Sequence, residues 1–208
     1  MELTALPSAR RLLRGLFAFL CIAVGLYPAL YFLIDREFGL LSSKTPELLA
    51  DLAWNIGFYA HIVPGGLALL IGWAQFSPGL RARRPALHRR IGRVYVLSVL
   101  VSGLAGLYIG FSATGGLPAA LGFISLALIW LYTTLMAWRS IVRGQVEAHA
   151  RLMRYSYAAS FAAVTLRIWL PLLIALTGSF DAAYPIVAWL CWVPNLAAVW
   201  AASRWQQA

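Results

Sequence analysis

The chain has 208 residues, of which 62% are hydrophobic and only 12% are charged. A soluble domain carries roughly twice that charged fraction to cover its surface, so the composition excludes an ordinary soluble protein. The formal net charge of +10 invites a nucleic-acid-binding interpretation. The distribution of the basic residues along the chain argues against it, because they alternate with apolar segments.

Six apolar segments are long enough to cross a membrane, since roughly 20 residues span about 30 Å of hydrocarbon. They lie at about 15–34, 52–76, 91–111, 117–138, 152–176 and 182–202. Most of the connections between them are short, which makes successive helices antiparallel neighbours. The predicted fold class is therefore all-α: one polytopic membrane domain, residues 1–208, built as a six-transmembrane-helix bundle.

The basic residues predict the orientation of this bundle. Fourteen of the 17 precede the first segment, follow the last one, or lie in and beside the second and fourth connections. The first, third and fifth connections contain only Arg36 and Lys44. This is the positive-inside pattern, which predicts that both termini are cytoplasmic. The expected location is a bacterial cytoplasmic (inner) membrane, with the arginines contacting anionic lipid headgroups. No nucleic-acid partner is expected, and the sequence does not indicate which protein, if any, is a partner.

A short motif, H-x-R-x-x-R, occurs twice on the predicted cytoplasmic side. It reads His88-Arg89-Arg90-Ile91-Gly92-Arg93 before the third segment and His149-Ala150-Arg151-Leu152-Met153-Arg154 before the fifth. The third and fifth helices run in the same direction, so His88 and His149 are expected at one depth. The 61-residue separation suggests a parallel repeat of two helices, and chance recurrence in basic loops is the alternative.

The matched depth of His88 and His149 suggests a cofactor. Axial ligation of one haem b needs two neutral imidazoles on facing helices. Neighbouring positive charges disfavour protonation of both rings, and nearby arginines are suited to haem propionates. These arginines are Arg90, Arg93, Arg151 and Arg154. The haem iron ligands would be His88 and His149, and the alternative is a pair of ordinary interfacial histidines among topogenic arginines.

A second pair of ionisable residues lies within the predicted spans. His61 is expected about 12 Å from the outer surface, just before Pro64, which weakens the helix. Arg167 lies about 22 Å along the fifth helix, at a similar depth. Such a charge costs about 2.5–3.5 kcal/mol in a span. Arg167 either reaches outward to Asp51 or Asp181 or binds an anionic ligand beside His61.

Small residues share a helix face with each of the three histidines, so all three are expected to point toward protein rather than lipid. Cys21 and Cys191 both lie in spans without C-x-x-C spacing, which is typical of packing residues. No hydrolase, zinc-protease or nucleotide-binding motif occurs in the chain. Whether the protein is an enzyme therefore stays open.

Three blocks of sequence together resemble a bacterial multi-pass membrane family, domain of unknown function 2306. They are His61 with Gly65-Gly66, the run Leu87 to Tyr95, and the run His149 to Tyr157 followed by Thr165-Leu166-Arg167. The resemblance covers the chain from the second helix onward and implies the membrane fold more than any activity.

A looser likeness is to the six-helix dihaem b-type cytochromes, which place histidines on four consecutive helices. Here the fourth helix has no histidine, so only the His88 and His149 pair fits. The sequence thus favours a haem-b electron-transfer component. The alternatives are a small-molecule or lipid transporter or binding protein with its site at His61 and Arg167, and a structural subunit without ligand.

Overall fold

The computed structural model describes residues 7–34 and 38–205, and Arg36 lies outside this part of the chain. All its regular elements are helices. In chain order these are α1 Pro7–Leu26, η1 Tyr27–Ala29, α2 Leu30–Leu33, η2 Gly39–Ser43, α3 Pro46–Ala50, α4 Leu52–Gly72, η3 Trp73–Phe76, α5 Pro78–Arg83, α6 Pro85–Gly110, α7 Gly116–Val142, α8 Val146–Ser160, α9 Ala162–Thr177, α10 Phe180–Leu190 and α11 Val193–Trp205.

These helices form the six expected spans. The six stretches that are long and apolar enough to cross a membrane are Arg11–Leu33, Leu52–Phe76, Pro85–Gly110, Gly116–Val142, Val146–Thr177 and Phe180–Trp205. The third and fifth begin about six residues before the predicted apolar segments. Helix α6 begins at Pro85, a residue suited to the first helical position, and continues through the basic motif. The H-x-R-x-x-R motifs therefore lie in the first turns of α6 and α8.

The surface of the bundle is apolar where a soluble protein would be polar. Phe32, Leu33, Leu104 and Tyr132 are each more than 60% exposed, among many other large apolar side chains. In an apolar stretch of 18 residues from each span, only 17–39% of the residues are buried inside the protein. Surface of this kind is stable in contact with lipid, so the chain is a multi-pass membrane protein.

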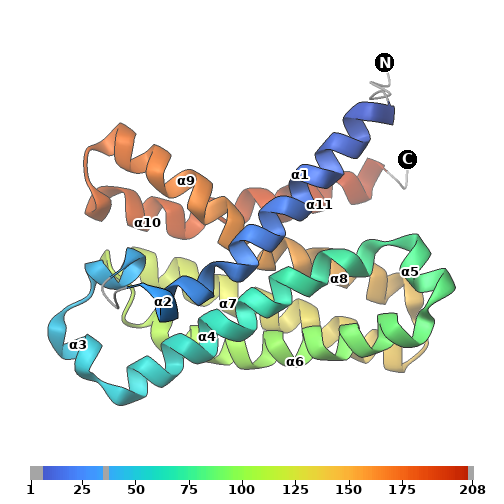
Figure 1. The fold of residues 1–208 in the computed structure, drawn as a ribbon, viewed down its shortest axis with the longest axis horizontal. Helices are drawn as coiled ribbons and strands as arrows, with labels where there is room; N and C mark the ends of the chain where they lie inside the picture. Colours follow the sequence, from blue (N-terminus) through green and yellow to red (C-terminus); the bar gives the residue numbers. More distant parts are fainter. Residues whose placement is uncertain (1–6, 35–37, 206–208) are drawn as a thin grey trace.

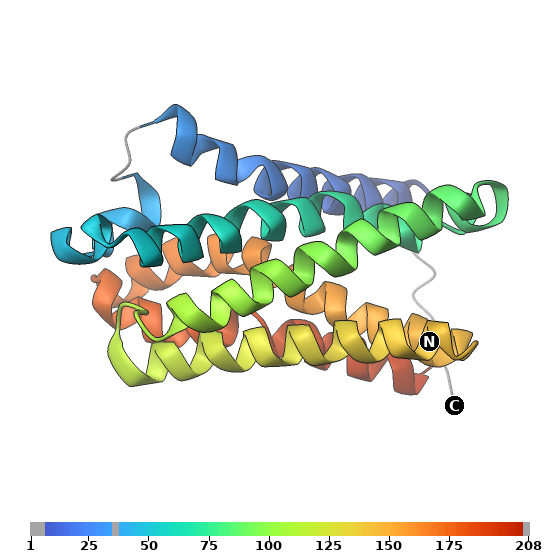
Figure 2. The same ribbon diagram turned by 90° about the horizontal axis from the view of Figure 1, so that it is seen from below.

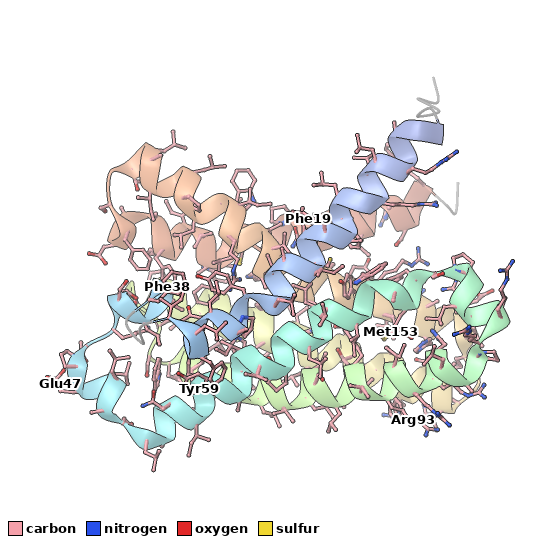
Figure 3. The ribbon with its side chains drawn as sticks, viewed as in Figure 1. Phe19, Phe38, Glu47, Tyr59, Arg93 and Met153 are labelled. Atoms are coloured by element: carbon pink, nitrogen blue, oxygen red, sulfur yellow. The ribbon has the colours of Figure 1, made fainter. Side chains whose placement is uncertain are left out.

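Most of the basic side chains lie at one end of the bundle. Arg93 lies at the end that carries α5, while Glu47 in α3 lies at the opposite end (Figure 3). The first residues of α1 and the last of α11 lie at the same end as α5 (Figure 1). We call this the basic end and the other the α3 end. Helices α4, α6, α7 and α8 run lengthwise between them, and the α9–α10 hairpin lies at the α3 end (Figures 1 and 2).

The fifth and sixth spans are each interrupted, although the sequence predicts an unbroken apolar segment for each of them. One break lies at Phe161, between α8 and α9, and the other at Cys191–Trp192, between α10 and α11. Pro194 accounts for the second, because proline lacks an N–H and disfavours helical geometry in the residue before it. Asn195 joins the two breaks by donating to the carbonyls of Ala158 (3.3 Å) and Cys191 (2.9 Å).

Helix α4, in contrast, passes through Pro64 without a break, although the sequence suggests a weak point there. The Ser102 hydroxyl of α6 donates to the His61 carbonyl at 2.7 Å, one turn before Gly65. Hydrogen bonds from a neighbouring helix to the backbone near a proline are common in membrane helices. Pro64 does not interrupt α4, which forms one continuous wall of the bundle.

Candidate functional site

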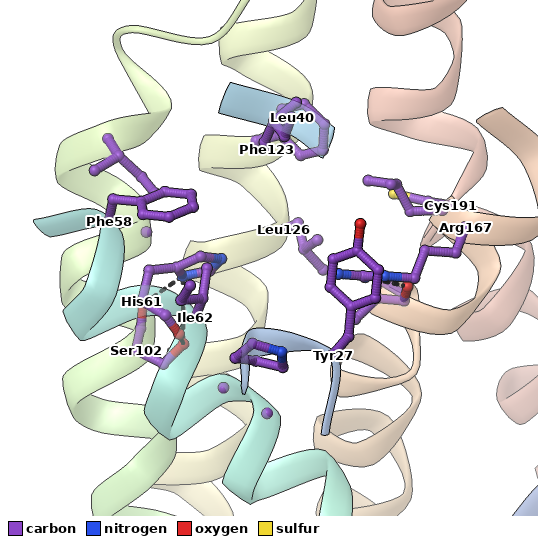
Figure 4. Close-up of a pocket in the computed structure, with 18 of the residues that line it drawn as sticks. Tyr27, Leu40, Phe58, His61, Ile62, Ser102, Phe123, Leu126, Arg167 and Cys191 are labelled. Atoms are coloured by element: carbon purple, nitrogen blue, oxygen red, sulfur yellow. Dashed lines mark hydrogen bonds between the residues drawn. The ribbon is translucent and has the colours of Figure 1, made fainter. Parts of the chain in front are cut away.

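A cavity of about 510 Å³ occupies the half of the bundle nearer the α3 end. Most of its lining side chains are aromatic or aliphatic, including Phe58, Phe123, Leu126 and Leu170. The lining residues come from α1, η1, α2, η2, α4, α6, α7, α8, α9 and α10, among other segments, so every span contributes to the wall. His61 and Arg167 both line it, on facing sides (Figure 4). The two residues, predicted at similar depth, thus line one cavity.

His61 is held in a fixed orientation by α6. Its Nδ1 lies 2.9 Å from the Ser102 carbonyl oxygen, and the Ser102 hydroxyl donates to the His61 carbonyl at 2.7 Å. The hydrogen-bond partner of the imidazole therefore comes from another helix. This reciprocal pair fixes the imidazole, as the dashed lines in Figure 4 show.

Two glycines make room for this pair. A methyl group at Gly106 would lie 2.9 Å from His61 Nδ1, and one at Gly65 would lie 2.8 Å from the Ser102 hydroxyl. Both distances are shorter than side-chain carbons tolerate, so α4 and α6 could not approach this closely with alanine at either position. Gly65 and Gly106, two of the small residues on these helix faces, therefore allow His61 to pack against α6.

Arg167 projects from α9 into the cavity. Its guanidinium donates to the Ala163 carbonyl at 2.8 Å and lies over the Tyr27 ring, 4.1 Å from its centroid. Its Nε is buried and has no hydrogen-bond partner among the described residues. Of the two carboxylates considered as partners, Asp51 accepts from the Ala53 N–H at the start of α4 instead. Cation–π contact holds Arg167 in place but leaves guanidinium donors for another acceptor.

Lys44 supplies a second positive charge where the cavity meets the α3 end. Its Nζ donates to the Ser112 carbonyl (2.7 Å) and the Thr114 hydroxyl (3.0 Å). Burial lowers the pKa of Lys44. Tyr27 and Tyr31 also line the cavity, and their hydroxyls lie beside Gly39, whose φ of +64° favours glycine.

Toward the basic end the cavity is closed by packed side chains. The Tyr95 hydroxyl lies 2.8 Å from that of Ser156 and 3.0 Å from that of Ser160. Tyr157 donates to the Leu69 carbonyl at 2.9 Å and also contacts Cys21. Both cysteines are free and buried, as expected of packing residues. The site is therefore separated from the basic end by a hydrogen-bonded core.

His88 and His149 lie outside this cavity, near the basic end. His149 Nδ1 bonds to the Ala137 carbonyl at 3.0 Å, which directs Nε2 away from that carbonyl. His88 Nδ1 is buried without a hydrogen-bond partner among the described residues. The two imidazoles are close enough to interact electrostatically. Haem ligation by this pair stays a prediction.

The arginines assigned to haem propionates surround the same region. Arg90, Arg93 and Arg151 are exposed, while Arg154 is half-buried and its Nε lies 3.5 Å from the Ala150 carbonyl. Their positions in the first turns of α6 and α8 equally suit contact with lipid headgroups. The described residues contain no group of three or more His, Cys, Asp or Glu side chains that could hold a metal ion.

The fold and the cavity define a class of protein: a six-span membrane protein with a basic, largely apolar internal site. The chain belongs to the family described as "Predicted membrane protein (DUF2306)", whose model matches residues 58–201. The resemblance seen in the three sequence blocks is thereby confirmed, whereas the likeness to dihaem cytochromes gains no support. No curated protein and no solved structure matches the chain significantly.

The matched region contains His61, Ser102 and Arg167 but not Tyr27 or Lys44. The sequence does not predict Tyr27, Lys44 or the Ser102 carbonyl as parts of a site. Its pattern marks Lys44 only as a cation of an outer connection, and Tyr27 ends an apolar helix like many interfacial tyrosines. Only the tertiary fold brings Tyr27 and Lys44 into the wall of the cavity that Arg167 also lines.

Proposed function

We propose that this protein binds, or carries, an anionic amphiphile within the membrane, with the anionic group at Arg167 and the apolar chain along the cavity wall. The observation that carries the proposal is the charge of the site. Arg167 and Lys44 line the cavity, and none of the described residues that line it is Asp or Glu. A cation in a poorly solvated site without an internal counter-ion is stabilised by an external anion.

The size and chemistry of the cavity support an amphiphile rather than a bare ion. Its volume of about 510 Å³ falls within the roughly 300–1,000 Å³ of small-molecule sites. A small inorganic anion would leave most of the apolar wall without a partner. Each methylene that enters such a wall contributes about 0.8 kcal/mol. A chain of about ten carbons with one anionic end satisfies both parts of the site.

Entry from the surrounding lipid is consistent with the lining residues. Tyr27 and Pro28 of η1 line one edge of the cavity, and Leu170 and Ile174 of α9 line another. Helix α9 lies at the edge of the bundle in Figure 1, and the segment from α1 to α2, which includes η1, lies at the edge in Figure 2. The spans are interrupted at Phe161 and at Cys191–Trp192, on either side of the α9–α10 hairpin, and these breaks support lateral access for a membrane-dissolved ligand.

The proposal is tested by comparing two probes of equal chain length and opposite charge. The full chain, purified in a non-ionic detergent, is heated with dodecanoate or with dodecyltrimethylammonium. A ligand that binds only the folded state raises its stability, by about 2.7 kcal/mol at 100 times Kd. We expect dodecanoate to raise the unfolding temperature and to bind at least about tenfold tighter, since like charge repels the cation. Equal effects of the two probes, or a preference for the cation, would contradict the proposal.

The orientation of the site in the membrane follows from the basic end. We infer that this end, with both termini and the α5 arginines, faces the cytoplasm of a bacterial inner membrane and contacts anionic headgroups. The cavity then lies in the outer half of the bilayer. We expect a reporter fused after Ala208 or between residues 77 and 84 to behave as cytoplasmic. One inserted between residues 44 and 47 should report the outside, and an inverted result at any position would refute this topology.

A further inference from the structure

The imidazole of His61 presents a hydrogen-bond acceptor to the cavity. The Ser102 carbonyl lies 2.9 Å from Nδ1, and a carbonyl only accepts hydrogen bonds. The Ser102 hydroxyl, 3.3 Å from Nδ1, already uses its single proton toward the His61 carbonyl. Both neighbours therefore require that Nδ1 carries the proton. In a neutral ring, Nε2 then has a free lone pair.

The surroundings of His61 keep the ring neutral. Arg167 faces it across the cavity, and no Asp or Glu among the described residues lines the space between them (Figure 4). A second positive charge here would be poorly solvated and would repel the first. None of the described residues makes a hydrogen bond to Nε2, although Nδ1 makes two contacts. An acceptor without a donor in an apolar cavity is incompletely satisfied, and a ligand donor would complete it.

We propose that the ligand is a hydroxylated amphiphilic anion, whose hydroxyl donates to His61 Nε2 while its anionic group contacts Arg167. This rests on the proposed function and names the class of ligand that the same site takes. A site that hydrogen-bonds a hydroxyl discriminates against the analogue that lacks it, because the buried acceptor is left unpaired. The pair of His61 and Arg167 thus selects hydroxy acids over simple acids of the same chain length.

The test compares dodecanoate with 3-hydroxydodecanoate and 12-hydroxydodecanoate on the purified full chain. We expect at least one hydroxy acid to bind about tenfold tighter than dodecanoate, despite being more soluble in water. In His61→Asn, the amide nitrogen retains a donor for the Ser102 carbonyl, but no atom replaces Nε2. This variant should lose the preference for the hydroxy acid over dodecanoate.

A second measurement needs no variant. The chain has only three histidines, so nitrogen NMR of ¹⁵N-histidine-labelled protein resolves each ring. We expect the hydroxy acid, and not dodecanoate, to shift one unprotonated Nε2 resonance. Equal binding of all three acids by the wild type, a preference that survives in His61→Asn, or an unmoved Nε2 resonance would each overturn the inference. Selective binding of dodecanoate over its cationic analogue would still uphold the proposed anion site, so the two failures are distinguishable.

Discussion

Replacing Arg167 by glutamine should weaken dodecanoate binding by about 10- to 100-fold while leaving the protein folded. A charge-assisted hydrogen bond contributes about 1.5–3 kcal/mol, and about 1.4 kcal/mol corresponds to a tenfold change in affinity. The variant should insert at least as well as the wild type, because it removes a charge that costs about 2.5–3.5 kcal/mol inside a span. The measurement is titration of purified protein with dodecanoate, alongside its unfolding temperature without ligand.

A matched control is available within the same chain. Arg204 also lies over an aromatic ring, 4.6 Å from the centroid of Trp200, as Arg167 lies 4.1 Å from that of Tyr27. Arg204 is in the last turn of α11, at the basic end, and does not line the cavity. Arg204→Gln should therefore leave dodecanoate affinity unchanged. If Arg167→Gln binds as tightly as Arg204→Gln, the guanidinium of Arg167 is not the anion site.

Substituting Gly72 by alanine should destabilise the bundle by about 1–3 kcal/mol, the usual cost of overpacking a core. A methyl group there would lie 2.4 Å from Tyr157 Cε2 and 2.9 Å from Tyr95 Cε2. Hydrogen bonds hold both rings in place. The Tyr157 hydroxyl donates to the Leu69 carbonyl, and the Tyr95 hydroxyl is hydrogen-bonded to the hydroxyls of Ser156 and Ser160. We expect a lower unfolding temperature and less monodisperse protein on size-exclusion chromatography.

Gly92→Ala is the control for this prediction. The added methyl group at Gly92 would meet only the Gln75 Oε1 atom, at an ordinary distance of 3.7 Å. Alanine has the higher helix propensity, by about 1 kcal/mol at most, so this variant should be as stable as the wild type or slightly more. Equal stability of Gly72→Ala and Gly92→Ala would show that α4 can move away from Tyr157, contrary to the close packing described here.

The sequence determined the membrane architecture, because the length of an apolar segment and the side on which arginines gather are properties of the chain itself. It also predicted that His61 and Arg167 lie at similar depth, since a helix rises by a constant amount per residue. The small residues around His61, such as Gly65 and Gly106, correctly marked the face that packs against another helix.

Only the tertiary structure decided what these residues contact. Helix α4 continues through Pro64, and Ser102, 41 residues away in the chain, donates a hydrogen bond to the His61 carbonyl of this helix. The break at Phe161 has no proline beside it, and Asn195 from another span bonds to the carbonyl of Ala158 there. Sequence patterns within one helix contain no information about such partners, since each pairing depends on how two helices cross.

The cavity is the clearest case of this difference. Its positive charge comes from Arg167 in α9 and Lys44 beside η2, and Tyr27 of η1 holds the guanidinium in place. The local sequence marks Arg167 as a charge inside a span, but it predicts Tyr27 and Lys44 only as ordinary residues of a helix end and a loop. Their position in one cavity depends on how α9, η1 and η2 fold together, because a binding site is formed by surfaces from several segments.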